Sequence, residues 1–155
     1  MNYGENFILK LKKHLVVFIT IFITTFIQSY WSMYQFRNKV SSSCINCGFF
    51  EDVFFGALIF SIPLTTIFLL VNKIKRLKYL NITIKTIFVL FFWFNLNMMT
   101  FQDRESSWST YSLADEIYYT ILFSKYILTM IMFILLFLEY KINKSIHLNT
   151  HIKLD

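Results

Sequence analysis

Charged residues are scarce in this chain, and their scarcity excludes an ordinary soluble domain. Asp, Glu, Lys and Arg make up 15% of the 155 residues, against about 25% in soluble globular proteins. Apolar residues make up 56%, and the charges gather in short blocks between long apolar runs. Those runs do not alternate polar and apolar residues, which excludes the strands of a membrane barrel.

Catalytic and metal-binding motifs are also lacking. The sequence contains no H-E-x-x-H, no G-x-S-x-G and no glycine-rich phosphate loop. A zinc site needs about four ligands. The cysteine pair at Cys44 and Cys47 could supply two, but the other candidates, His147 and His151, belong on the opposite face of the membrane in the topology described below. The sequence therefore predicts no metal site and no resident cofactor.

Four apolar runs dominate the chain, at about residues 15–30, 53–71, 82–99 and 117–138. A helix needs about 20 residues to cross a hydrocarbon core about 30 Å thick, and the first and third runs reach this length with flanking residues. No small-residue cleavage site follows the first run, so we expect it to be retained as a helix. The sequence predicts an all-α, polytopic membrane protein, one four-helix transmembrane domain with a polar tail over residues 141–155.

Basic residues lie on one side of the predicted bundle. Four crossings place the N-terminal segment, the turn after the second helix and the C-terminal tail together, and these carry Lys10, Lys12, Lys13, Lys73, Lys75, Arg76, Lys78, Lys141, Lys144 and Lys153. The positive-inside rule then predicts that both termini are cytoplasmic. The net charge of +6 reflects this topology, and no basic face remains for nucleic acid. We expect multi-pass insertion in a bacterial inner membrane.

The stretch SSSCINCGFF holds Cys44 and Cys47, the only cysteines, in the predicted first outer loop. In an oxidising periplasm a disulfide here would close a very small loop, and its stabilisation would be at the low end of the usual range. A thiol–disulfide oxidoreductase is the alternative, because the positive end of the following helix lowers the pKa of a nearby thiol. A structural disulfide, or free thiols, is the favoured interpretation of the pair.

The position of this pair resembles that in the membrane enzymes that pass electrons from a disulfide-introducing partner to quinone. The resemblance rests on four helices, on Cys44-Ile45-Asn46-Cys47 in the first outer loop and on Phe50-Glu51 close behind. It implies a redox role for the two cysteines and a bound quinone. The chain departs from the family in lacking a second cysteine pair in residues 100–116, and in having Glu51-Asp52 where the family has a basic residue.

Lys125 is the polar residue of greatest interest within the predicted helices. It lies roughly 12 Å from the outer end of the fourth apolar run, and a lysine near the bilayer centre costs at least ~2.5 kcal/mol. The side chain can reach outward along the helix or face the bundle. We expect it to face the bundle, near Asn95 and Asn97 of the third run.

Pro63 interrupts the second run and should kink that helix, because proline cannot donate to the carbonyl one turn back. Ser61, Thr65 or Thr66 could bond the carbonyl that is freed. Four acids at predicted helix starts are expected to interact with the positive helix ends, and they are Glu51, Asp52, Asp115 and Glu116.

These features favour a small membrane protein that acts by protein–protein interaction in the bilayer, as an accessory, regulatory or defence-type subunit, over an enzyme. In size and layout it is loosely similar to immunity proteins against pore-forming bacteriocins. Its partners would be lipid, another membrane protein or further copies of itself. A thiol oxidoreductase using Cys44 and Cys47 is one alternative, and an oligomeric channel or transporter subunit built around Lys125 is another.

Overall fold

The computed structural model describes the backbone of residues 3–73 and 78–151, and the side chains of residues 11–73 and 80–141. Within these residues lie four long helices: α1 (Tyr3–Ser32), α2 (Phe49–Val71), α3 (Lys78–Arg104) and α4 (Leu113–His151). Each contains a segment long and apolar enough to cross a membrane. The prediction of an all-α fold with four such helices is therefore confirmed.

The helices extend beyond the apolar runs, because backbone hydrogen bonding continues through the polar residues that flank them. Helix α1 begins at Tyr3, and α4 continues past the fourth run to His151. Some residues used above to orient the chain lie outside the described side chains; these are Lys10, Lys75, Arg76, Lys78, Lys144 and Lys153. The two histidines considered as zinc ligands, His147 and His151, also lie outside them.

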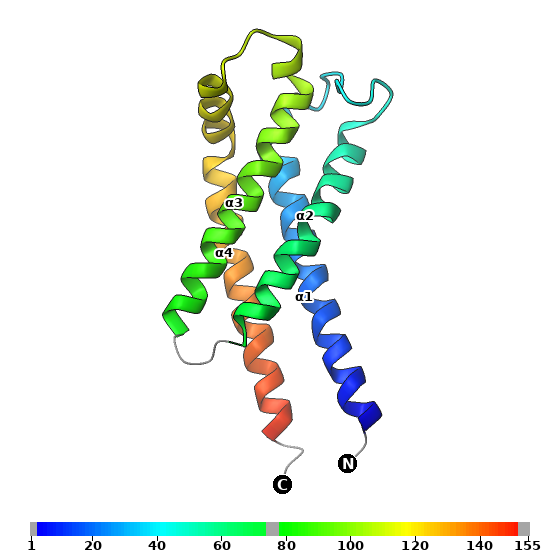
Figure 1. Ribbon diagram of the computed structural model, residues 1–155, viewed down its shortest axis with the longest axis vertical. Coiled ribbons are helices and arrows are strands. Elements are labelled where there is room, and N and C mark those ends of the chain that lie inside the picture. Colours follow the sequence, from blue (N-terminus) through cyan, green and yellow to red (C-terminus); the bar gives the residue numbers. More distant parts are fainter. Residues whose placement is uncertain (1–2, 74–77, 152–155) are drawn as a thin grey trace.

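The four helices form an up-and-down bundle. Helix α1 packs against α2 and α4, and α3 packs against the same two helices. Helices α1 and α3 begin, and α2 and α4 end, at one end of the bundle, called here the terminal end (Figure 1). The connections over residues 33–48 and 105–112 lie at the other end, called the loop end, where they contain the short 3-10 helices η1 (Tyr34–Phe36) and η2 (Ser106–Trp108).

The apolar core consists of two separate clusters. The terminal-end cluster contains Val17, Ile21, Leu64, Phe68, Val89, Trp93, Leu128, Ile131 and Leu135. The loop-end cluster contains Met33, Phe36, Phe49, Val53 and Phe101. The outer surface of the bundle is also largely apolar, as expected for helices that contact lipid on one side and each other on the other.

Aromatic side chains line the contact between α1 and α2. Helix α1 has an aromatic residue at every fourth position from Phe18 to Tyr30, which places these rings along one face. The ring of Phe22 meets that of Phe54 at 5.3 Å, and the ring of Phe26 meets that of Phe50 at the same distance. Such pairs add about 0.5–1.5 kcal/mol each beyond the area they bury.

All four acids lie in the first turn of α2 or α4, as predicted, and two of them cap their helix. Glu51 accepts a hydrogen bond from the backbone N–H of Gly48 at 3.2 Å, at the start of α2. Asp115 accepts from the backbone N–H of Ser112 at 3.1 Å, and the Ser112 hydroxyl accepts from the N–H of Asp115 at 3.3 Å, which is a reciprocal cap of α4. The other two acids, Asp52 and Glu116, bond to residues of α3 and its following turn.

Candidate functional site

Cys44 and Cys47 form a disulfide in the connection between α1 and α2, with their Cα atoms 5.3 Å apart. The backbone closes a tight turn here, since the N–H of Cys47 donates to the carbonyl of Cys44 at 3.0 Å. The N–H of Cys44 donates to the hydroxyl of Ser41 at 3.1 Å. Both cysteines are partly exposed, so the disulfide lies at the surface of the loop end.

Arg104, at the end of α3, holds this loop onto the bundle, although it is only 2% exposed. Its guanidinium donates to the carbonyl of Lys39 at 2.5 Å and to the carbonyl of Cys47 at 3.3 Å. The same group forms an ion pair with Asp52 of α2 at 2.5 Å and lies over the ring of Phe49. One buried arginine therefore joins the disulfide loop, α2 and α3.

Asp103 provides the second attachment of the loop. Its carboxylate accepts hydrogen bonds from the hydroxyl of Ser42 at 3.0 Å and from the backbone N–H of Ser43 at 2.8 Å. The backbone carbonyl of Asp103 also accepts from the N–H of Ser42 at 2.9 Å. Nearby, Glu116 accepts from the hydroxyl of Ser106 and, at 2.7 Å, from the side-chain amide of Gln102. The two loop-end connections are thus fixed by polar contacts to α3 and α4.

Lys125 does not face the interior of the bundle, so the prediction that it does is wrong. Its side chain is exposed, and its ammonium lies 4.9 Å from the ring centroid of the exposed Tyr126. The buried positions of this part of α4 include Ser124 and Leu128. One residue advances a helix by about 100°, so Lys125 is turned away from the axis of the bundle. Among the described residues, no carboxylate pairs with it.

Asn95 and Asn97, the expected partners of Lys125, form no hydrogen bond with it. Asn95 is half-buried and donates to the carbonyl of Phe91 in its own helix at 2.7 Å. Asn97 is fully buried, and neither atom of its amide has a hydrogen-bond partner among the described residues.

Asn97 belongs to a buried polar layer that separates the two apolar clusters. On α3 it lies between Trp93 of the terminal-end cluster and Phe101 of the loop-end cluster. On α1 the interval between the two clusters holds the buried polar residues Thr24, Thr25, Gln28, Ser29 and Ser32, and on α4 the buried Thr120 and Ser124 precede Leu128. The side-chain oxygens of Gln28 and Ser29 also have no partner in the described structure. A buried polar group without a hydrogen-bond partner lowers the stability of a fold, so this layer is a part of the core that costs the bundle stability.

A buried ion pair at the terminal end was missed by the sequence reasoning. Lys85 of α3 is 3% exposed and contacts Glu139 of α4 at 2.6 Å. Its ammonium also donates to the side-chain oxygen of Asn72 at 2.6 Å, and the amide of Asn72 donates to Glu139 at 3.1 Å. The available signal was that Lys85 is the one charged residue in the third apolar run, and an intramembrane charge suggests a pairing or functional role.

Pro63 is half-buried inside α2, which is continuous from Phe49 to Val71. The neighbouring hydroxyls do not bond the carbonyl of Ile59 that the proline frees. Ser61 donates instead to Ala57, Thr65 to Ser61 and Thr66 to Ile62. The expectation about these hydroxyls is therefore wrong, because each bonds the carbonyl four residues before its own position.

No protein-family model, curated protein or solved structure matches this chain.

Proposed function

We propose that this chain is a small multi-pass membrane protein that acts by binding another membrane protein within the bilayer, as an accessory, regulatory or immunity-type subunit. The observation that carries the proposal is the position of Lys125. It lies about 18 Å along α4 from Leu113, on an exposed and largely apolar stripe that includes Leu122, Tyr126 and Met130.

A lysine in this position is unfavourable against lipid and favourable against a carboxylate. An isolated charge at depth costs at least ~2.5 kcal/mol, and charged residues in membrane helices usually pair or face water. The side chain leans toward the start of α4, which recovers part of the depth. A protein partner with an acidic group at that height would supply the missing counter-charge and cover the apolar stripe.

The proposed orientation has both termini in the cytoplasm of a bacterial cell and the disulfide loop outside. It is supported by the basic residues of the terminal end, including Lys12, Lys13 and Lys73, and by the acids of the loop end. This orientation exposes Lys125 to partners in the outer half of the inner membrane. The described chain has little mass outside the bilayer, which favours recognition through helix faces.

Site-specific photo-crosslinking in native membranes tests the proposal. A photoreactive amino acid at position 126, beside Lys125, should give a discrete protein adduct, and the same probe at position 91 on α3 serves as a matched lipid-facing control. The Lys125→Met variant should lose the adduct at position 126, since it keeps the apolar stem and removes the charge. Crosslinking to lipid alone at position 126 would refute the proposed function.

Thiol–disulfide exchange is a second candidate, favoured by the formed and partly exposed disulfide between Cys44 and Cys47. The pair lies just before α2, whose positive end stabilises a thiolate. Reduction would take up two electrons and two protons and yield two thiols, and a quinone could accept those electrons on reoxidation.

A redox titration with thiol trapping decides this second candidate. A disulfide that exchanges at about −120 to −230 mV lies in the range of catalytic dithiols, whereas structural disulfides resist reduction to below about −300 mV. The Lys125→Met variant should leave the reduction potential of the disulfide unchanged, because Lys125 lies on α4 and the disulfide lies in the connection between α1 and α2. A potential below about −300 mV would refute the redox role.

A further inference from the structure

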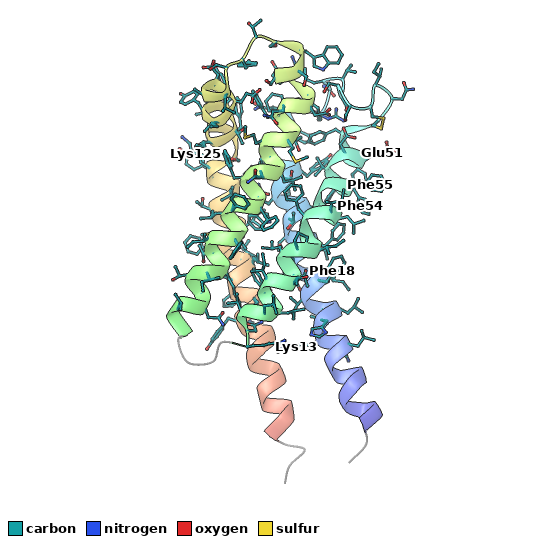
Figure 2. All side chains as sticks on the ribbon, in the orientation of Figure 1. Lys13, Phe18, Glu51, Phe54, Phe55 and Lys125 are labelled. Atoms are coloured by element: carbon teal, nitrogen blue, oxygen red, sulfur yellow. A yellow bond between two sulfur atoms is a disulfide. The ribbon has the colours of Figure 1, made fainter. Side chains whose placement is uncertain are left out.

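Two exposed charges of opposite sign lie on opposite sides of the bundle at similar heights. Figure 2 shows Lys125 on one side and Glu51 on the other, both in the loop-end half of the molecule. Helix α2 begins lower than α4 in the same view, which is why the second residue after Phe49 and the twelfth after Leu113 reach comparable heights (Figure 1).

Glu51 heads an exposed apolar stripe on α2. Phe55, Ile59 and Ile62 continue this stripe along the helix, with relative exposures of 60%, 63% and 58%. One oxygen of the Glu51 carboxylate accepts the hydrogen bond from Gly48, and a carboxylate offers about four acceptor positions. In the part of the chain that the structure describes, no cation pairs with Glu51, whereas its neighbour Asp52 is taken by Arg104.

The stripe on α4 is the complement of the stripe on α2. It is largely apolar, with Ile121, Leu122, Tyr126 and Met130 among its exposed side chains, and it carries a positive charge at Lys125. Helices α2 and α4 both begin at the loop end. Two copies inserted in the same orientation can therefore place the α2 stripe of one beside the α4 stripe of the other, with the charges at the same depth.

We infer that the membrane partner is a second copy of this chain, and that Lys125 of one copy pairs with Glu51 of the next. The inference rests on the proposed function and names the partner. The two surfaces are different patches of one molecule, so the contact is head-to-tail and generates a ring or a row of copies. The pair supplies Lys125 with a counter-charge in the bilayer, and Glu51 keeps its bond to Gly48.

Self-association can be tested in lipid vesicles by energy transfer between labelled copies whose charges at positions 51 and 125 are changed. Copies carrying donor and acceptor dyes are mixed, and energy transfer is measured as the lipid-to-protein ratio rises. Wild type should associate, and K125M or E51Q should weaken association at least about tenfold. Gln at position 51 still accepts the Gly48 hydrogen bond, and K141M, which alters an exposed lysine at the terminal end of α4, should have no effect.

The decisive samples are K125E and E51K. K125E alone brings two carboxylates together at each contact, and E51K alone brings two ammonium groups together, so neither should associate. An equimolar mixture restores an opposite-charge pair at every contact and should associate as wild type does. Helix content by circular dichroism and retention of the Cys44–Cys47 disulfide establish that each variant is folded.

The outcomes separate this inference from the proposed function. A mixture that stays dissociated, or a K125E sample that still associates, overturns the pairing of Lys125 with Glu51. Loss of association in K125M but not in E51Q overturns the pairing and leaves an intramembrane partner surface at Lys125. A wild-type chain that stays monomeric in vesicles, yet gives a discrete adduct with a different protein at position 126, refutes the second copy and upholds the proposed function. A monomeric chain that gives only lipid adducts refutes both.

Discussion

Removing Lys85 should destabilise the bundle far more than removing both members of its ion pair. The ammonium donates two hydrogen bonds of 2.6 Å, to Glu139 and to Asn72. Hydrogen bonds to charged groups are worth about 1.5–3 kcal/mol each, which gives about 3–6 kcal/mol for the two. Lys85→Met leaves Glu139 buried with the amide of Asn72 still bonded to it, so we expect a loss of about 3 kcal/mol, at the lower end of that range.

The double variant Lys85→Met with Glu139→Leu should lose less than about 1 kcal/mol, because replacing a buried ion pair by apolar residues is often neutral. The free energy of unfolding can be measured by titrating a mixed micelle with a denaturing detergent while following helix content. Lys141→Met is the matched control, since this lysine is exposed and lies at the same end of α4. A loss below about 1 kcal/mol for Lys85→Met, or a double variant as costly as the two single changes added, would refute the reasoning.

Three further predictions concern the loop end and the polar layer. Arg104→Met should lower the free energy of unfolding by about 2–4 kcal/mol and raise the rate of hydrogen exchange in residues 39–47. Arg104→Lys should be intermediate, because lysine lacks the planar fork that bonds several acceptors at once. An unchanged exchange rate in the loop would contradict this. Asn97→Leu should raise the free energy of unfolding by about 1–2 kcal/mol, because it removes two unpartnered buried amide atoms, and a loss of stability would show that the amide is bonded in the membrane. Replacing Cys44 and Cys47 by serine should cost no more than about 2 kcal/mol in the same titration, as expected for a loop of four residues.

The four spans could be predicted from the sequence because helix formation in lipid is local. A run of about 20 apolar residues must satisfy its own backbone hydrogen bonds, and this requirement does not depend on the rest of the chain. The caps at Glu51 and Asp115 were predictable for the same reason, since each acid bonds a backbone group three residues away. The arrangement of the basic segments at one end follows directly from counting four crossings.

The direction of Lys125 could not be predicted, because the environment of α4 is apolar on both sides. In a soluble helix, polar residues mark the outer face and reveal the phase of the helix. Here Ile, Leu and Phe occupy both the buried and the lipid-facing positions, so the pattern carries little information about which face packs. The small hydroxyl residues do not resolve the ambiguity, since Thr120 and Ser124 are buried whereas Thr129 is exposed.

The ion pairs depend on how the helices are rotated and displaced relative to each other. Asp52 and Arg104 are 52 residues apart in sequence, and Lys85 and Glu139 are 54 apart. Sequence inspection places the first pair in loops or helix ends and the second within or beside apolar runs, but not in contact. Each pair requires neighbouring antiparallel helices to present the two residues at one height, which is a tertiary property.

The charges of this bundle therefore divide into two groups that should respond differently to substitution. Arg104, Asp52, Lys85 and Glu139 join helices of one chain at the two ends, so their loss should appear in the free energy of unfolding. Lys125 and Glu51 project from exposed stripes of α4 and α2, where substitutions usually change stability by no more than about 0.5 kcal/mol. If these two residues join separate copies, their substitution changes association and leaves unfolding of the single chain nearly unchanged. A variant of Lys125 that destabilised the monomer as strongly as Lys85→Met would place it in the first group and remove the basis for an intermolecular role.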